Sequence, residues 1–186
     1  SMAKQIECFD VQVDCAGGAP VSGYYARPTG AKPRSCPAVI SFHGAGARSS
    51  SLAGAAGQAL AGRLGMDINA HGSPNGKPEE YYKELLATGP LKLYWYIGID
   101  NRETCYFLGM YLRVMRAMEF LTAQPEWDGK ILITSGGSQG GAQSIVAAGL
   151  NPQVTLVNAS VPALCDLTGQ AADRASGWPF GTRKLS

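Results

Sequence analysis

Histidine, charge and long apolar stretches are all scarce in this sequence, and each shortage excludes a class of protein. Only 2 of the 186 residues are histidine, and 16 lysines and arginines nearly balance 14 acids, which gives a net charge of +2. No basic run and no alternation of basic with aromatic residues is present, so nucleic-acid binding is not predicted. No apolar stretch is long enough to cross a bilayer, so we expect no membrane-spanning segment.

Cysteine is present but forms no recognisable pattern. The five cysteines are scattered along the chain and have no C-x-x-C spacing. Such a set favours buried free thiols over a disulfide framework or a zinc site. We therefore expect neither a metal nor a cofactor.

A signal peptide is also missing, but this leaves the compartment open. The chain begins with Ser1 and Met2, an opening typical of the remnant that a protease leaves after it removes a tag. A native leader could have been removed from the same end. The sequence is therefore compatible with a cytoplasmic protein and with a secreted one.

Apolar runs of strand length alternate with helical patterns along the chain. Strands are predicted within residues 5–27 and at 38–46, 65–72, 131–135 and 154–160, and helices at 49–65, 79–87, 102–124 and 138–150. In the longest helix we expect an apolar face of Leu108, Leu112, Met115 and Leu121, with Arg113, Arg116 and Glu119 on other faces. The alternation is typical of an α/β layered fold around a mostly parallel sheet. No linker divides residues 1–186, which we interpret as a single domain.

Three glycine-rich loops follow predicted strands, at residues 43–46, 69–72 and 136–141. Ligands of a parallel sheet collect beyond the carboxyl ends of its strands, so these loops are expected at one edge of the sheet. Glycine after a strand is also routine turn chemistry. The combination of the three loops, rather than any single loop, therefore predicts a ligand site at this edge.

The last of these loops, GGSQGG, has the spacing of a nucleophile elbow. Gly136 and Gly140 lie two residues before and after Ser138, between a predicted strand and a predicted helix, where a tight turn leaves no room for side chains. We predict that Ser138 is a catalytic nucleophile. The N–H of Gln139, at the positive end of the helix dipole, would be one oxyanion donor, and the N–H of Ala45 in the first loop would be the second.

Five segments of the sequence resemble one known family: PAVISFHGAGARSSS, DINAHGSPNGKP, YFLGMYLRVMRAMEFL, PEWDGKILITSGGSQGG and VPALCD. In this order they are similar to the acetyl xylan esterase and cephalosporin C deacetylase group of α/β-hydrolases, from about residue 20 to residue 180. The resemblance implies a serine esterase that deacetylates a small acetylated carbohydrate through an acetyl-serine intermediate. It implies the same nucleophile and oxyanion amides, and a supporting role for His43 and Gly44 in the oxyanion loop. Relatives commonly have tyrosine where this chain has Ala45.

Partners for the nucleophile are missing from the sequence. In this fold the triad acid and then the histidine follow the serine along the chain. No histidine follows Ser138, and the later acids are Asp166 and Asp173. We therefore expect an α/β-hydrolase that lacks the last strands, which carry the triad acid and histidine. Such a C-terminally truncated chain is expected to be weakly active or inactive by itself.

The two histidines present before Ser138 are His43 and His71. The resemblance assigns His43 to the support of the oxyanion loop. His71 lies in the loop at 69–72, at the same sheet edge, and could act as a base for the serine. The alternative, a loop histidine that hydrogen-bonds the backbone, is the favoured interpretation.

Several other residues have more than one interpretation. Asp166 could cap a helix or serve as an acid in the pocket, and the cap is favoured. A group of aromatic residues could form a rim on which sugars stack, or could pack in the core or against another subunit: Tyr81, Tyr82, Tyr94, Trp95 and Tyr96. An open sheet edge would also favour self-association, which leaves a homo-oligomer open.

Two functions of other classes fit the same sequence. One is a non-catalytic module that keeps the hydrolase fold for binding or assembly. The other is a different hydrolase activity, that of a peptidase, a thioesterase or a dienelactone hydrolase. The resemblance favours the carbohydrate esterase over both.

Overall fold

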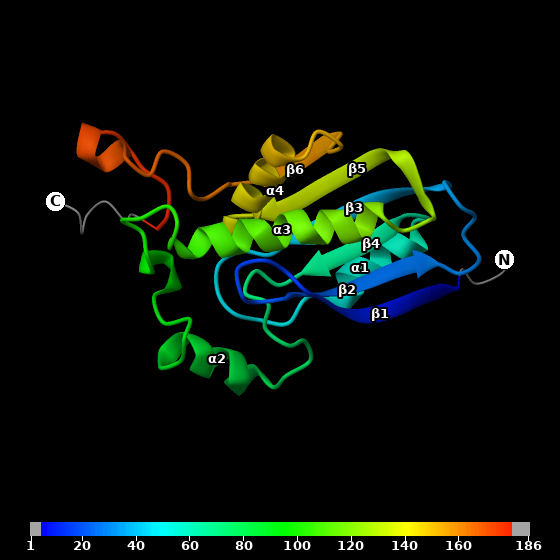
Figure 1. The fold of residues 1–186 in the computed structure, drawn as a ribbon, viewed down its shortest axis with the longest axis horizontal. Helices are drawn as coiled ribbons and strands as arrows, with labels where there is room; N and C mark the ends of the chain where they lie inside the picture. The colour runs from blue at the N-terminus through cyan, green and yellow to red at the C-terminus, as the bar shows by residue number, and fades with distance from the viewer. Residues whose placement is uncertain (1–4, 180–186) are drawn as a thin grey trace.

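A computed structural model describes residues 5–179 as a six-stranded sheet with helices on both faces (Figure 1). The strand order is β1-β2-β4-β3-β5-β6, in which β1 and β2 are antiparallel to their neighbours and the others are parallel. The strands are β1 (Ile6–Val13), β2 (Val21–Pro28), β3 (Cys36–Phe42), β4 (Leu64–Ile68), β5 (Trp127–Gly137) and β6 (Leu156–Ser160). This is the mostly parallel sheet that the sequence predicts.

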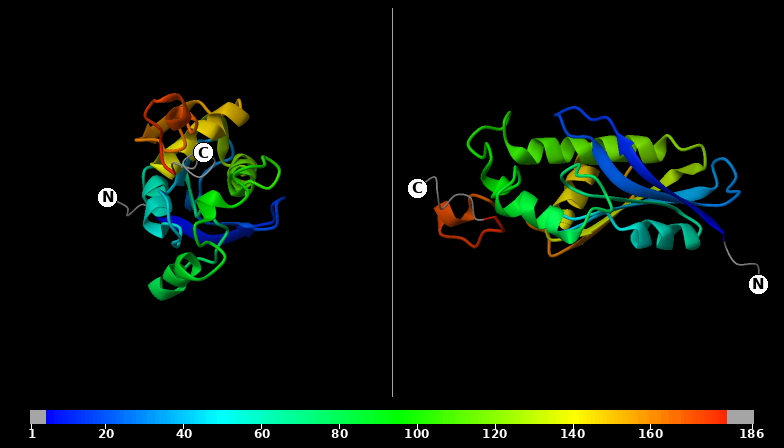
Figure 2. Two further views of the ribbon diagram at one scale, coloured as in Figure 1. Left: turned by 90° about the vertical axis from the view of Figure 1, so that its left-hand side faces the viewer. Right: turned by 90° about the horizontal axis from the view of Figure 1, so that it is seen from below.

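Helices cover the two faces of the sheet unequally. They are α1 (Leu52–Leu60), α2 (Glu79–Ala87), α3 (Tyr106–Thr122) and α4 (Gln139–Leu150), with short 3-10 turns η1 (Tyr94–Tyr96) and η2 (Gly169–Ala172). Helix α3 lies along one face and α1 along the other (Figure 2), and α4 packs beside α3 on β3, β5 and β6. No helix of residues 5–179 is long and apolar enough to span a membrane.

Element boundaries differ from the expected ones where glycine or local packing intervenes. The strand expected at 38–46 ends at Phe42, and the helix expected at 49–65 ends at Leu60, just before Gly62, which has φ 85°. The helix expected at 102–124 is also shorter, since α3 starts only at Tyr106. Ser51 caps the start of α1, because its side chain accepts a hydrogen bond from the N–H of Gly54 at 2.9 Å.

The expected apolar face of α3 is wrong in two positions. Leu108 is exposed, whereas Arg113 is only 3% exposed. The buried face instead carries Phe107, Met110, Val114, Ala117, Met118 and Leu121, which pack on the sheet and on the segment before the helix. The spacing of apolar residues predicts which side chains share a face of the helix, but it does not predict which other segments of the protein pack against each face. The β1–β2 turn and the loop after β4 cover the side on which Arg113 lies.

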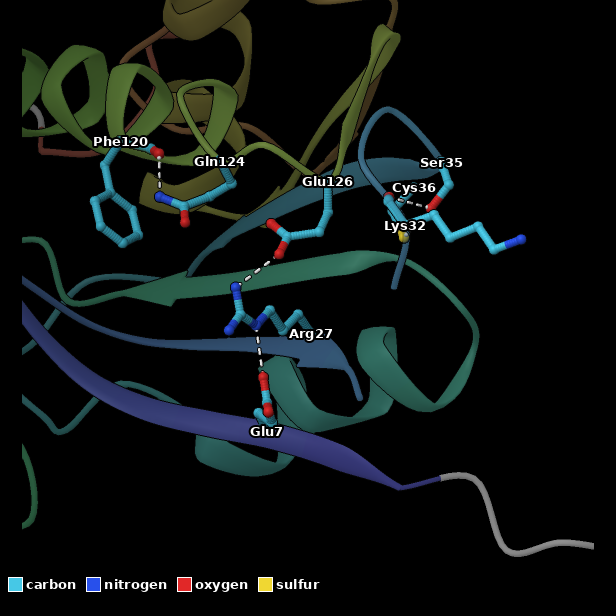
Figure 3. A network of polar contacts seen from close by, with 8 residues as sticks. All are labelled: Glu7, Arg27, Lys32, Ser35, Cys36, Phe120, Gln124 and Glu126. Atoms are coloured by element: carbon cyan, nitrogen blue, oxygen red, sulfur yellow. Dashed lines mark hydrogen bonds and ion pairs between the residues drawn. The ribbon is translucent and has the colours of Figure 1, made fainter. Parts of the chain in front are cut away.

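A charged network holds the end of the sheet away from the loops described below. Arg27 on β2 contacts Glu7 on β1 at 2.6 Å through Nε and Glu126, just before β5, at 2.7 Å through Nη1 (Figure 3). Glu126 is 9% exposed, so the Arg27–Glu126 pair is more shielded from solvent than the Arg27–Glu7 pair. The network joins the antiparallel edge to the central strands.

Cysteine burial agrees only partly with expectation. Cys36 is buried in the main core, but Cys8 and Cys165 are exposed. The expectation of buried thiols is therefore wrong for these two residues. Residues Cys15 and Cys105 are partly buried.

The strand β6 forms one border of the described sheet. It pairs with β5 on one side, and four of its five residues are exposed. Leu156 and Val157 are 52% and 38% exposed, which is unusual for apolar residues in a parallel strand of this fold class. The border therefore presents both unpaired backbone and apolar side chains.

Candidate active site

The carboxyl ends of β3, β4 and β5 bring the three glycine-rich loops to one end of the molecule. The segment from α2 through η1, and residues 161–179 after β6, lie beyond the same end (Figure 1). The structure thus places the loops at 43–46, 69–72 and 136–141 where the sequence predicts them. Ser138 lies at the centre of this arrangement, between β5 and α4.

The backbone of Ser138 is in a conformation that serine rarely adopts. Its φ is 54° and its ψ is −120°. Such a conformation costs about 1–3 kcal/mol and persists only where the surroundings enforce it. This is the geometry of a sharp strand-to-helix turn that projects a side chain from the sheet edge, as the elbow spacing predicts.

Glycines on both sides of Ser138 allow the turn to be this tight. A Cβ on Gly136 would collide with the carbonyl of Gly140, and a Cβ on Gly140 would collide with the carbonyl of Phe42. Gly141 is also close, since its Cβ would lie 3.0 Å from the carbonyl oxygen of Ser160. The elbow is therefore packed directly against the ends of β3 and β6.

The loop after β3 lies against the elbow. A Cβ on Gly44 would be 3.7 Å from the Cβ of Ser138, so the two backbones are neighbours. The carbonyl oxygen of Ala45 accepts a hydrogen bond from Arg48 at 2.7 Å, and this contact fixes the peptide group between Ala45 and Gly46. Gln139 is the first residue of α4, and its N–H therefore has no acceptor within the helix. Ala45 and Gln139 thus lie on the two segments that flank Ser138.

The imidazole of His43 supports its own loop. Nδ1 donates to the carbonyl of Gly44 at 2.8 Å, because a carbonyl can only accept. Burial lowers the pKa of His43 to about 4, so the ring is neutral at pH 7. Nε2 is buried and has no hydrogen-bond partner among the described residues. The side chain is therefore held in one tautomer with a buried acceptor nitrogen.

Both ring nitrogens of His71 are in use. Nε2 contacts the carbonyl oxygen of Gly46 at 3.2 Å and must donate to it, so Nδ1 accepts from the hydroxyl of Tyr106 at 2.7 Å. Burial lowers the pKa of His71 to about 3. In this arrangement the ring is neutral, 6% exposed and engaged with the oxyanion loop. The geometry matches a loop histidine that bonds the backbone, which is the favoured of the two expectations.

A residue that the sequence did not single out for this role joins the two loops around Ser138. The hydroxyl of Tyr94 donates to Oε1 of Gln139 at 2.5 Å and accepts from the N–H of Gly46 at 3.4 Å. Tyr94 is fully buried, and its ring packs edge-on against His71 with centroids 4.6 Å apart. The aromatic run at 94–96 was the available signal, but nothing in it distinguishes Tyr94 from its neighbours.

The other aromatic residues of interest differ in their burial. Tyr82 is buried and donates to the carbonyl of Pro74 at 2.7 Å, which is a packing role. Trp95 and Trp178 are partly buried and meet edge-on, with ring centroids 5.3 Å apart. Of the original group, Tyr94 and Tyr82 therefore belong to the core.

Asp166 does not cap a helix. The first residue flanking η2 is Thr168, and no side chain caps this turn. The Asp166 carboxylate instead forms a fork-like ion pair with Arg174, with contacts of 3.0–3.1 Å, on an exposed surface. The favoured expectation of a helix cap is wrong, because the residue at the start of η2 is Thr168 and the Asp166 carboxylate pairs with Arg174 instead. Within residues 5–179, no group of three or more histidine, cysteine or acidic side chains is arranged to hold a metal.

Comparisons with known proteins agree on one family. The acetyl xylan esterase (AXE1) family model matches residues 1–173. The acetyl esterase Axe7A of Xylanibacter ruminicola is 38% identical over 123 residues, which are 66% of this chain and 28% of that protein. The structure of an acetyl xylan esterase from Paenibacillus sp. R4 superposes with a TM-score of 0.77 at 27% identity, over 99% of this chain and 58% of that one.

More distant structures share the fold alone. Acetyl xylan esterase 1 from Thermoanaerobacterium sp. JW/SL YS485 superposes with a TM-score of 0.70 at 20% identity, and covers 98% of this chain. A dienelactone hydrolase-like phosphotriesterase from metagenomic libraries gives a TM-score of 0.62 at 20% identity. The chain spans about three tenths of the curated relative and about six tenths of these structures.

Proposed function

The chain belongs to the acetyl xylan esterase (AXE1) family, and we propose that it supplies the nucleophile and oxyanion hole of a serine esterase that deacetylates a small carbohydrate. The observation that carries this proposal is the backbone of Ser138, which is held at φ 54° between a strand and a helix. Strain of this kind at a serine is expected where its hydroxyl must be presented to a substrate. The related Axe7A is named as an acetyl esterase, which supports acetyl as the acyl group that is removed.

In the proposed reaction the Ser138 hydroxyl attacks the carbonyl carbon of an acetyl ester. The tetrahedral oxyanion accepts hydrogen bonds from the N–H groups of Ala45 and Gln139, and the sugar alcohol leaves. Water then attacks the acetyl-serine and releases acetate. The positive end of α4 lies at the serine and favours the negative charge that develops there.

Ser138 also needs a general base, and neither histidine of the chain is available for this role. His43 and His71 hold the backbone of the oxyanion loop. Their low pKa values make both rings poor proton acceptors. We therefore propose that the base and its acid are contributed from outside residues 1–186. Esterase activity would require both of these groups.

An assay of acetate release from an acetylated xylo-oligosaccharide tests the proposal. A full-length protein that contains this chain should release acetate, and Ser138→Ala should lower the rate of release by about three orders of magnitude or more. Peptide, thioester and lactone substrates, assayed in parallel, should be poorer. Equal rates for the wild type and Ser138→Ala would contradict the proposal, as would a preference for one of the other substrate classes.

The 186-residue chain provides a second test. It should hydrolyse p-nitrophenyl acetate at a rate only slightly above that of uncatalysed hydrolysis, because an unactivated serine hydroxyl attacks slowly. Turnover well above background that is abolished by Ser138→Ala would contradict the view that the chain by itself lacks a base. Absence of phosphonate labelling at Ser138 in the full-length protein would instead support a non-catalytic binding module.

A further inference from the structure

A separate cavity borders His71 and lies between the amino-terminal half of α3 and the β1–β2 turn. Its volume is about 280 Å³. The side of α3 contributes Tyr106, Gly109 and Arg113, which are spaced as neighbours on one helical face. Gly17 and Ala19 close the opposite wall. The cavity does not include Ser138 and has no part in the reaction proposed above.

The cavity contains a buried positive charge. Arg113 is 3% exposed, and its Nε donates to the carbonyl of Ala70 at 3.0 Å. No carboxylate of residues 5–179 lies within ion-pair distance of its guanidinium. The phenol of Tyr106 lies close enough to interact with it electrostatically. Buried charges are normally paired, so a guanidinium without an anion at the wall of a cavity indicates a missing partner.

Tyr106 cannot compensate this charge. Its hydroxyl donates to Nδ1 of His71, as the tautomer of that ring requires. Burial raises the pKa of Tyr106, so the phenol stays protonated and neutral. His71 is neutral as well. The amino-terminal end of the 17-residue helix α3 also borders the cavity and adds its own positive potential.

The remaining walls define what kind of anion fits. Ala19, Leu108 and Leu112 are apolar, and the guanidinium lies against Gly109, where a Cβ would be 3.5 Å from Nη1 of Arg113. Glu103 lies at the cavity too, where its carboxylate pairs with Arg102 at 2.9 Å. A carboxylate at the border opposes a second negative charge on the ligand. The site is therefore suited to a monoanion with a short apolar tail.

We propose that this cavity binds a short-chain carboxylate, whose two oxygens pair with the guanidinium of Arg113 while its alkyl chain contacts Leu108 and Leu112. The planar fork of arginine matches a carboxylate in a bidentate contact. The volume exceeds that of acetate and accommodates several further methylene groups. The binding requires neither Ser138 nor any esterase activity, so it can fail or succeed independently of the proposed function.

Isothermal titration and thermal melting of the 186-residue chain test the site, with acetate, propionate and butyrate at constant ionic strength in chloride. Saturable binding is expected, with affinity increasing about 4-fold per added methylene. Acetamide, which has the same shape without the charge, should not bind. No saturable binding of butyrate above the chloride background would overturn the proposal. Phosphate binding more tightly than butyrate would overturn the carboxylate assignment.

Four variants separate a specific site from a general effect of salt. Arg113→Met should abolish binding, and Arg113→Lys should weaken it at least 10-fold, because a lysine ammonium lacks the bidentate fork. Glu103→Gln removes the opposing charge and should tighten binding about 2-fold to 3-fold, a gain that misfolding cannot imitate. Arg63→Met, an exposed arginine between α1 and β4 and away from the cavity, is the matched control and should change nothing. Butyrate affinity that is unchanged in both Arg113→Lys and Glu103→Gln would overturn the assignment.

Discussion

The hydroxyl of Tyr94 donates a hydrogen bond of 2.5 Å to Oε1 of Gln139, 45 residues later in the chain. The same hydroxyl accepts from the N–H of Gly46 at 3.4 Å. One buried phenol therefore ties the residue after Ser138 to the loop after β3. These are the two segments that would supply the oxyanion donors, so their relative position depends on Tyr94.

Tyr94→Phe should destabilise the protein by about 1–3 kcal/mol, because Oε1 of the fully buried Gln139 loses its donor and the Gly46 N–H loses its acceptor. Urea denaturation at pH 7 measures the change in the free energy of unfolding. Tyr81→Phe, a partly exposed tyrosine on α2, is the control and should cost under about 0.5 kcal/mol. Equal losses in the two variants would show that the bridge is energetically unimportant.

Two glycines of α4 should respond oppositely to the same substitution. Gly140→Ala should prevent folding or cost more than about 3 kcal/mol, because its Cβ would collide with the Phe42 carbonyl. Gly149→Ala, in open space at the other end of the helix, should stabilise by about 0.5–1 kcal/mol. Thermal melting of both variants compares them. A mild effect of Gly140→Ala would contradict the packing of the elbow described here.

The two histidines should make the protein sensitive to mild acid. The pKa values of His43 and His71 are lowered in the folded state to about 4 and about 3, so the unfolded chain binds more protons below pH 6.5. Stability is then fully present above pH 6.5 and is lost as the pH falls. Between pH 7 and pH 5 each histidine should cost about 2 kcal/mol. Urea denaturation measures the loss, and the two imidazole Hε1 signals in NMR should not titrate above pH 5.

Asp67 should have the opposite pH dependence. Burial raises its pKa to about 6, although the N–H of Ser51 donates to it at 2.7 Å. Its contribution to stability is present below pH 3.8 and is lost as the pH rises through 6. Ionisation should therefore cost up to about 3 kcal/mol at pH 8 and offset about 1 kcal/mol of the histidine effect at pH 5.

Asp67→Asn keeps an acceptor for Ser51 and removes this charge. The variant should be more stable than the wild type by about 1–3 kcal/mol at pH 8 and nearly equal to it at pH 4. Asp100→Asn, at an exposed position, should show neither difference. Denaturation curves at the two pH values test this pair. A variant that is less stable at pH 8 would mean that Asp67 is stabilised as an anion by the start of α1.

The β6 border of the sheet should promote self-association. Its exposed Leu156 and Val157 accompany a row of unpaired backbone groups. Sedimentation velocity of the 186-residue chain should show a concentration-dependent dimer or larger species, and Val157→Lys should shift it toward monomer. Gln153→Lys, an exposed position just before the strand, adds the same charge as a control. Identical behaviour of the two variants would place the contact elsewhere.

Residue patterns were sufficient to predict the layered α/β fold and the elbow. Apolar runs of strand length alternate with helical periodicity, and the G-x-S-x-G spacing at 136–140 reflects a steric requirement that acts over five residues. The strand order and the positive φ of Ser138 agree with that prediction. Local sterics and periodicity are encoded within short segments, so the sequence determined them by itself.

Long-range contacts decided the rest. The burial of Arg113, the use of both His71 nitrogens and the bridge from Tyr94 to Gln139 each join residues that are 25 to 45 positions apart. An amphipathic pattern placed Arg113 on a polar face because it takes no account of a neighbouring loop. The ionisation state and partner of a buried polar group depend on which segments surround it, and only the tertiary structure brings those segments together.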